Sequence, residues 1–559
     1  MRFAGGVRGV EWWGGEERMT GVGVALGGVG TAHRVRNVRP RGRRGWRCLV
    51  RSSGAVGGGS AEGERVACVV VGSGVSGMSA AFRAQRDIAA GKGRGRVVVT
   101  EGRDRVGGNV TTRKADGFLW EEGPNSFQPG DGIMTAAYDA GCGDDLVLAD
   151  PTSKRWVLWD GTLHALPAGP EDVLFDLLTW PGKLRAGMGV VGLKPPPPPG
   201  VEESVEQWVR RNLGAEAFER LIEPFCSGVY AGDPSKLSAE AAVNKVWRLE
   251  GLGGSLGGGM LKVMEEKKAA AESAPPRDPR LPVIKGSTVG SFRDGLITLP
   301  LTQQKALEAD GGEVRLEHKL VGITKRGKDF VLEYDTPGGK TTLVTPRVFV
   351  TAPAYALAEV LKSNVPAAAT ALEQFYYPPV CAATIAYPTK DFQVLPSGFG
   401  QLHPRSQGVR TLGTIYSSEL FPGRVPDGWT MVLNYIGGAQ DVAIGDMSES
   451  EIVDIVDADA RKTLLKPDAP KPKVLGVRTW HKAIPQFNVG HNALLADVRS
   501  ALEAAGMGES DGLTLGGNFV FGVALGKCVE AGTEVGRTLG KQVLADKSAA
   551  SDKVGSAKK

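Results

Sequence analysis

The sequence contains few cysteines, and their spacing argues against two structural classes. The six cysteines are Cys48, Cys68, Cys142, Cys226, Cys381 and Cys528, and no two of them form a C-x-x-C pair. A disulfide framework needs paired cysteines, and a structural zinc site needs clustered ligands. We therefore predict a protein of a reducing compartment without a metal site.

The sequence also has no long apolar run and no large net charge outside its first 60 residues. No uncharged apolar run reaches about 18 residues, so we expect no transmembrane helix. The formal net charge is +5, of which residues 1–60 contribute +8 and the remainder −3. A body this close to neutral gives no support to nucleic-acid binding.

The two ends of the chain differ from the rest in composition. Residues 1–60 contain eleven arginines, no lysine and three glutamates. An arginine-rich, acid-poor leader is typical of an organelle transit peptide. We predict a disordered transit peptide over 1–62 and a disordered low-complexity tail over 546–559.

One stretch, Val66–Gly77, predicts a nucleotide site. It reads as a buried strand, a glycine turn and a helix from about Met78, with G-x-G-x-x-G spacing at Gly72, Gly74 and Gly77. The first glycine permits the turn, the second lets the backbone approach a pyrophosphate, and the third lets helix and strand pack closely. The N-terminus of the helix favours a diphosphate.

The residues that follow indicate which dinucleotide binds. A second strand, Val97–Thr100, ends in Glu101, whose carboxylate suits the ribose hydroxyls. The run Arg105-Val-Gly-Gly-Asn109 resembles the second fingerprint of amine-oxidase-type flavoproteins. There Gly107 and Gly108 would let backbone amides reach the phosphates, so FAD is favoured over NAD.

Periodicity and turn signals predict the remaining elements. We expect a hairpin over 155–166, helices over 201–250 and 450–466, loops over 251–259 and 274–282, a βαβ-like return over 283–353, an antiparallel sheet over 380–437, a strand at 513–518, and a long helix from Gly522. Residues 170–193 are apolar and allow two interpretations, a core helix pair or an interfacial membrane patch with Trp180, Lys183 and Arg185 at the headgroups.

Several long runs resemble the protoporphyrinogen oxidase family, most closely its plastid-type members. The runs are Val71–Gly77, Arg105–Asn109, Glu121–Gln128, Leu221–Ser238, Val289–Arg293, Gly398–His403, Thr411–Tyr416, Ala483–Gln486, and Gly516–Asn518 with Gly522–Gly526. The resemblance covers about residues 64–542. The leader shows none of it.

The resemblance implies a mixed α/β (α+β) fold with a Rossmann-like FAD-binding domain, an antiparallel-sheet substrate domain and a helical membrane-binding domain. The implied domains are 63–140 with 283–353 and 475–545 for FAD, 141–165 with 354–474 for substrate, and 166–250 for the membrane. It also implies six-electron oxidation of protoporphyrinogen IX to protoporphyrin IX, with oxygen as acceptor and peroxide as product, for haem and chlorophyll synthesis.

Location and partners follow from the same resemblance. It implies a chloroplast protein held monotopically on the thylakoid or envelope membrane surface. It leaves room for a homodimer and for hand-over of product to metal chelatases. No late cysteine other than Cys528 is present, so we expect one non-covalent FAD per chain.

The resemblance also assigns residues. Against FAD it places Gly72, Ser73, Gly74, Val75, Ser76, Gly77, Glu101, Gly107, Gly108, Asn109, Gly123, Pro124, Asn125, Ser126, Val321, Val523, Ala524 and Leu525. Against the substrate it places Asn125, Arg155, Gly228, Ala231, Phe399 and Tyr416. Val321 would lie by the adenine, Val523–Leu525 by the flavin ring, and Arg155 against a propionate.

Two other functions stay open at this point. Another FAD oxidase or desaturase of the same fold, such as one acting on carotenoids, would share residues 66–128 but not the later runs. A non-catalytic flavin-binding scaffold is the second, although nothing in the cofactor motifs indicates decay.

Overall fold

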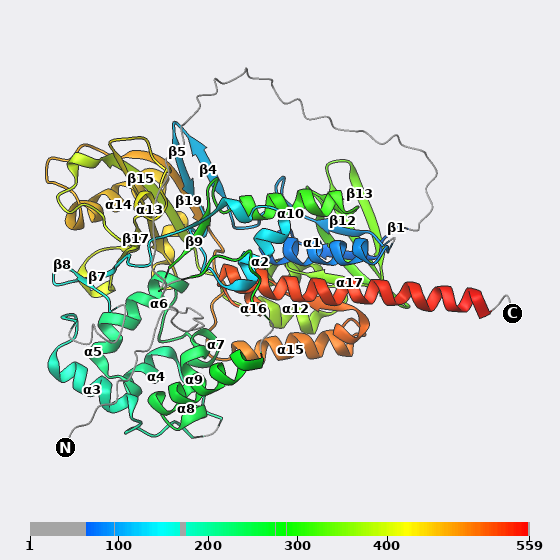
Figure 1. Ribbon diagram of the computed structural model, residues 1–559, viewed down its shortest axis with the longest axis horizontal. Helices are drawn as coiled ribbons and strands as arrows, with labels where there is room; N and C mark the ends of the chain where they lie inside the picture. The colour runs from blue at the N-terminus through cyan, green and yellow to red at the C-terminus, as the bar shows by residue number, and fades with distance from the viewer. Residues whose placement is uncertain are drawn as a thin grey trace, which may run out of the picture.

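The computed structural model describes residues 63–93, 95–167, 175–198, 200–273, 276–284, 286 and 288–556. The predicted transit peptide and the first part of the 170–193 segment lie outside these residues. The described chain forms three parts: a nucleotide-type domain around α1 and α17, a sheet domain around β15 and α14, and a helical domain around α3, α4, α8 and α9 (Figure 1).

A five-stranded parallel sheet organises the first part. Its strands are β2 (Cys68–Val71), β3 (Val97–Thr100), β10 (Glu313–Arg315), β14 (Val348–Val350) and β20 (Leu513–Leu515). Their spatial order is β10-β3-β2-β14-β20. This is the order of a Rossmann half, with ligands expected beyond the carboxyl ends of the strands.

Both faces of this sheet are covered. Cys68 and Val70 pack with helices α1 (Val75–Ala90) and α17 (Leu525–Ser556). Val69 and Val71 point to the other face, where they pack with strands of a β-meander and with two helices. These elements are β11 (Lys319–Arg326), β12 (Asp329–Thr336), β13 (Gly339–Thr345), α11 (Ala354–Leu361) and α12 (Pro366–Glu373). The near-continuous apolar strands reflect this double burial.

The second part is a seven-stranded sheet with order β19-β15-β18-β17-β16-β7-β8. Its strands are β7 (Arg155–Trp159), β8 (Thr162–Ala165), β15 (Val380–Pro388), β16 (Gly400–Leu402), β17 (Thr411–Ile415), β18 (Trp429–Gly437) and β19 (Lys473–Trp480), and α14 (Glu449–Thr463) packs on it. The predicted hairpin, antiparallel sheet and 450–466 helix are confirmed. One pair, β16 with β7, is parallel.

The third part consists of short helices. They are α3 (Trp180–Val190), α4 (Val205–Asn212), α5 (Ala215–Ala217), α6 (Glu223–Tyr230), α7 (Ala239–Ala242), α8 (Asn244–Gly253) and α9 (Leu256–Ser273). The expectation of helix throughout 201–250 is wrong at 231–238, where Asp233 accepts the backbone N–H of Ser235 and Pro234 cannot continue a helix.

The expected loop at 251–259 is also wrong, because α8 and α9 occupy most of it. Gly253 and Gly259 there serve close helix packing rather than flexibility. A Cβ on Gly253 would lie 2.0 Å from the backbone nitrogen of Gly259, and one on Gly259 would lie 2.0 Å from the carbonyl oxygen of Leu249. Any larger residue would separate the two helices.

Four further boundaries differ from expectation. Helix α1 begins at Val75 rather than near Met78, so its first turn belongs to the nucleotide motif. The 283–353 segment contains the β-meander as well as α10 (Thr298–Ala309), and so is more than a βαβ return. Helix α17 begins at Leu525 after the short α16 (Asn518–Phe521), and it continues to Ser556 where a disordered tail was predicted.

Candidate active site

One large cavity of about 2720 Å³ joins the three parts of the molecule. A pocket for a single drug-sized ligand has about 300–1,000 Å³, so this volume suits a dinucleotide together with a second large molecule. The expected cofactor residues that line it are Gly72, Gly74, Val75, Ser76, Glu101, Gly107, Gly108, Asn109, Gly123, Pro124, Asn125, Ser126, Val321, Val523, Ala524 and Leu525.

The glycine turn presents a bare backbone to the cavity. Gly72 has φ +99°, which favours glycine, and it turns the chain from β2 toward α1. A Cβ on Gly74 would meet only the Cα of Gly108, at 4.0 Å, and would otherwise project into open space. The free N–H groups at the start of α1 lie beside this space, as a diphosphate requires.

Ser73 and Gly77 do not line the cavity, so their expected direct contact with cofactor is wrong. Both are buried behind the turn. A Cβ on Gly77 would lie 2.0 Å from the carbonyl oxygen of Gly72, so this glycine permits close packing of helix on strand. The carbonyl oxygen of Ser73 accepts a hydrogen bond from the N–H of Gly107 at 2.9 Å. This bond joins the two glycine loops, the Gly72–Gly77 turn and the loop of Gly107 and Gly108.

Glu101 follows β3 at the carboxyl edge of the sheet. Its Oε2 accepts hydrogen bonds from the backbone N–H and the hydroxyl of Ser73, at 3.0 and 2.7 Å, and its Oε1 accepts the N–H of Arg103 at 3.0 Å. These bonds hold the carboxylate at the cavity wall. The geometry fits a group that binds a ribose.

Val321 occupies an irregular position in β11. The register of β11 against β12 shifts between Leu320 and Gly322, so Val321 is the extra residue of a β-bulge. The bulged residue is left outside the ladder pairing, which frees its backbone for a ligand. Val321 also lines the cavity, so its free backbone groups could bind the edge of an adenine.

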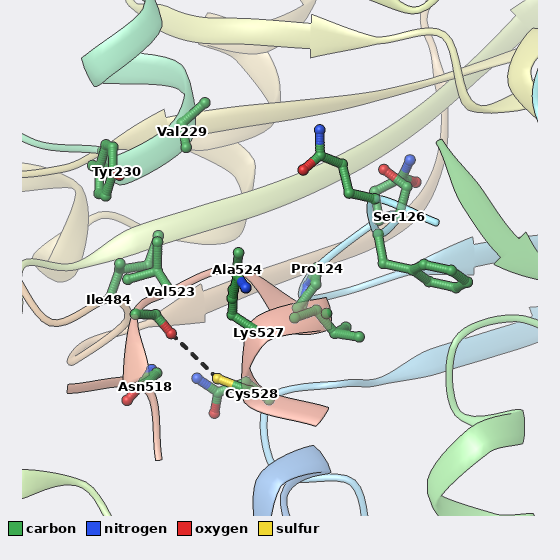
Figure 2. Close-up of a pocket in the computed structure, with 18 of the residues that line it drawn as sticks. Pro124, Ser126, Val229, Tyr230, Ile484, Asn518, Val523, Ala524, Lys527 and Cys528 are labelled. Atoms are coloured by element: carbon green, nitrogen blue, oxygen red, sulfur yellow. Dashed lines mark hydrogen bonds between the residues drawn. The ribbon is translucent and has the colours of Figure 1, made fainter. Parts of the chain in front are cut away.

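The middle of the cavity is formed by two loops that face each other. Figure 2 shows Pro124 and Ser126 on one side and Val523 and Ala524 on the other. Asn125, between Pro124 and Ser126 in the sequence, is buried. Its Oδ1 accepts a hydrogen bond from Ser417 at 3.3 Å, whereas its Nδ2 has no acceptor among the described residues. A buried amide nitrogen without a protein partner is completed by a bound ligand or an ordered water.

A second arm of the cavity runs from this point toward the helical domain. Arg155, at the start of β7, lies with its guanidinium carbon 5.5 Å from the ring centroid of Phe399, and both residues line the wall. Gly228 and Ala231, on and after α6, line the same arm. A Cβ on Gly228 would lie 2.4 Å from the Cδ2 of Leu402, so a larger residue would displace the Leu402 side chain, which also lines the cavity.

Ala231 adopts the left-handed conformation, with φ +49° and ψ +36°. For a non-glycine residue this costs about 1–3 kcal/mol and persists only where its surroundings hold it. Here the carbonyl of Ala231 accepts the N–H of Ala439 at 2.8 Å. The turn that ends α6 is thus fixed against the sheet domain, and it sets the width of the second arm.

Tyr416 is only 1% exposed, lies in the core between the sheet and α14, and does not line the cavity. Its predicted place in the slot wall is wrong. Its hydroxyl donates to Gln401 at 2.7 Å, and Gln401 does line the cavity.

The aromatic residue that does reach the wall from β18 is Tyr435. Its hydroxyl donates to the carbonyl of Gly123 at 2.7 Å, so it also fixes the loop before Pro124. The sequence analysis missed both Tyr435 and Trp480. The Nε1 of Trp480 donates a hydrogen bond to the carbonyl of Glu122 at 2.7 Å. Their positions in β18 and β19 are the only local signal, and they do not reveal which face of the sheet turns to the cavity.

Acid–base groups are scarce in the second arm. Among the described lining residues between Arg155 and Val246 there is no Asp, Glu or His. His403 directly follows Leu402, which lines the cavity. His403 is buried, and burial lowers its pKa to about 4, so it is neutral near pH 7. It does not line the cavity. The arm can therefore bind and orient an apolar acid but offers no evident proton relay.

Helix α3 has one face turned to solvent and the other toward the cavity. Trp180, Leu184 and Val191 are 72%, 69% and 67% exposed, so the core-helix interpretation is wrong for the described part of this segment from Trp180 onward. Arg185 does not reach outward as expected; it donates to the carbonyls of Arg210, Arg211 and Asn212 and caps α4. In the described part of the chain, no helix has both the length and the apolar character that crossing a bilayer demands.

Comparison with known proteins agrees with this geometry. The model of the family described as flavin containing amine oxidoreductase matches residues 75–539. The chloroplastic protoporphyrinogen oxidase of Oryza sativa subsp. japonica is 52% identical over 517 residues, covering 90% of this chain and 94% of that one. Protoporphyrinogen oxidase 1 of Arabidopsis thaliana, also chloroplastic, is 50% identical over 503 residues, covering 87% and 91%.

Solved structures show the same fold. A crystal structure from Exiguobacterium sp. 255-15, described under the name protoporphyrinogen oxidase, superposes with a TM-score of 0.67 at 25% identity, covering 87% of this chain and 100% of that one. The cyclohexylamine oxidase of Brevibacterium oxydans IH-35A gives 0.59 at 15% identity, covering 86% and 99%. The chain thus belongs to the flavin-containing amine oxidoreductase family and, within it, groups with the plastid-type protoporphyrinogen oxidases.

Proposed function

We propose that this chain is an oxygen-dependent protoporphyrinogen oxidase that converts protoporphyrinogen IX to protoporphyrin IX with peroxide as product. The observation that carries the proposal is the continuity of the cavity. Its nucleotide arm, with the glycine turn and Glu101, opens into an apolar arm that contains Arg155 and, among the described lining residues from 155 to 246, no carboxylate. A wide apolar slot with a cation at its wall matches a macrocycle with propionate side chains.

FAD is the cofactor that the nucleotide arm fits, one per chain and without a covalent bond. Cys528 lies at the cavity wall beside the Val523–Leu525 turn, and its sulfur donates to the carbonyl of Gly522 at 3.2 Å (Figure 2). Burial raises the pKa of this thiol to about 11. The thiolate is the nucleophilic form, so this cysteine is unsuited to attack the cofactor.

The chain's own contribution to turnover is orientation. When bound, FAD supplies the electron acceptor for removal of hydrogen from the substrate. Asn125 holds the junction between the two arms, and Phe399 with Arg155 sets the position and rotation of the macrocycle. Gly228 and Ala231 keep the slot wide enough. Positioning of this kind supplies a large part of a barrier reduction without any acid–base group.

A peroxide assay tests the function. The purified protein is expected to oxidise protoporphyrinogen IX, with protoporphyrin fluorescence and peroxide rising together. If it instead desaturates a carotenoid precursor, the related-oxidase alternative holds. If flavin is bound and no substrate reduces it, the chain is a scaffold.

We also propose monotopic attachment of the helical domain to a plastid membrane. Trp180, Leu184 and Met188 on α3, and Val191 at its C-cap, recur at helical spacing and are exposed. Apolar side chains on one face of a helix, with tryptophan among them, suit the boundary between headgroups and acyl chains. Leu193, just after the helix, extends the same exposed surface.

Replacing Trp180, Leu184 and Val191 by serine should abolish cosedimentation with lipid vesicles without unfolding the protein, because all three side chains are exposed. Vesicle partitioning and thermal unfolding are measured together. The matched control replaces Leu395 and Val442, exposed apolar residues of the sheet domain, by serine. Equal partitioning of the α3 variant and the control would refute the proposed surface.

For localisation, we propose that residues 1–62 act as a plastid-targeting transit peptide. A fusion of residues 1–64 to a fluorescent reporter is expected to enter plastids, because the leader is rich in arginine and poor in acids. A version with the eleven arginines changed to glutamine serves as control and should stay in the cytosol. Cytosolic fluorescence of the unaltered fusion would contradict the proposal. The homodimer and the hand-over to chelatases stay predictions.

A further inference from the structure

The proposed substrate carries two carboxylates, and Arg155 accounts for one. Lys183, on α3, is a second cation at the wall of the same arm. The sequence analysis placed it among headgroups; in the structure it is half-buried and also lies at the cavity wall. Its ammonium lies 5.0 Å from the ring centroid of Trp180 and 5.3 Å from that of Phe175, and Phe175 also lines the cavity.

The surroundings of Lys183 keep it available for an anion. Leu178, Ala186 and Val190, its lining neighbours from this part of the chain, are apolar. Asp176 is close enough to feel Lys183, but the pKa of its carboxyl is lowered first by a hydrogen bond from His164 and only last by Lys183. The side chain of Asp176 is itself 77% exposed, so water screens it.

The aromatic rings give Lys183 a defined direction. A cation over an aromatic face is attracted by the ring quadrupole, and two such faces restrict a flexible side chain. An ammonium held in this way retains its three N–H donors for a carboxylate, and hydrogen bonds between two charged groups are the strong ones. Arg155 and Lys183 come from different elements, β7 and α3, and both lie at the wall of the cavity.

We infer that Lys183 binds the second carboxylate of the macrocycle and so acts with Arg155 as a specificity-determining residue for a dicarboxylic substrate. The inference rests on the proposed function, since it assigns the other end of the same substrate. It makes the wall of α3 a recognition surface on one side and a lipid-facing surface on the other.

The test pairs a protein change with a substrate change. Lys183→Met keeps the length and apolar stem of the side chain but removes its charge. With protoporphyrinogen IX we expect KM to rise about ten-fold while kcat is kept, because one charge-assisted bond in a partly wet site is lost. With the dimethyl ester, which has no carboxylate, wild type and variant should have the same KM.

Binding of the product gives a readout independent of turnover. Quenching of tryptophan fluorescence by protoporphyrin IX should show about the same ten-fold rise in Kd for Lys183→Met, and none with the dimethyl ester. Lys183→Arg should restore most of the affinity. Lys262→Met, an exposed lysine of α9, is the matched control and should leave both constants unchanged.

Each alternative outcome has a separate meaning. An unchanged KM and Kd for the diacid would overturn the inference. An equal loss for diacid and diester would also overturn it, because Lys183 would then act through the packing of α3. A wild-type protein that oxidises neither porphyrinogen would instead refute the proposed function, while the Kd comparison would still decide whether Lys183 recognises a carboxylate.

Discussion

Gly74→Val is expected to yield a folded protein without flavin. A Cβ at position 74 meets no protein atom closer than the Cα of Gly108, at 4.0 Å, so the chain itself leaves room for a Cβ at this position. The valine methyl groups would instead fill the space between the two glycine loops, where the pyrophosphate must approach the backbone. Flavin absorbance per mole of purified protein measures the effect, and activity should be lost with it.

Two companions make this result specific. Gly74→Ala adds only the Cβ and should retain an intermediate flavin content. Gly251→Val makes the same change in α8, also into open space but away from the cavity, and should keep full flavin. The Tm of the Gly74 variants should fall toward that of apoprotein, because a ligand that binds only the folded state stabilises it. A full flavin spectrum in purified Gly74→Val would show that the pyrophosphate lies elsewhere.

Arg155→Ala should lower kcat/KM for protoporphyrinogen IX by about ten- to a hundred-fold, with flavin content unchanged. The loss corresponds to about 1.5–3 kcal/mol for a hydrogen bond to a charged group. Arg155 lines the substrate arm and lies over Phe399, but it is not part of the nucleotide arm. Steady-state kinetics at equal flavin loading provide the measurement.

The same hairpin offers the control. Lys154 precedes Arg155, lies over Trp156 at 5.6 Å, and does not line the cavity, so Lys154→Ala should leave kcat/KM intact. Arg155→Lys keeps the charge but loses the planar guanidinium with its paired donors. Its kcat/KM should therefore lie between those of the wild type and Arg155→Ala. Undiminished kcat/KM in Arg155→Ala would remove this residue from the site, and total loss with flavin bound would assign it a role in the chemistry itself.

The double variant tests whether the two carboxylates are read independently. Arg155 and Lys183 lie on different elements, so their effects on binding of the diacid should multiply. With the dimethyl ester, neither change should matter. A double variant no worse than either single one would mean that both residues contact the same carboxylate.

Local patterns by themselves determined the nucleotide half of the site. A strand, a glycine turn and a helix are neighbours in sequence, and the constraint at Gly72 or Gly77 is a short-range steric one. The hairpin at Asp160-Gly161 and the capping-box start of α14 at Ser448 depend likewise on a few consecutive residues. Such features can be read from the chain without knowing what packs against them.

Only the tertiary structure decided which side chains of the substrate half face the cavity. Tyr416 directly follows β17 and Tyr435 lies within β18, yet the first is buried against α14 and the second reaches Gly123. The reason is that the sheet turns one face to the cavity and the other to a helix. Arg185 and Lys183 are two residues apart on α3. Arg185 caps α4, whereas Lys183 lies at the wall of the cavity. Their roles depend on partners distant in sequence, and no local pattern carries that information.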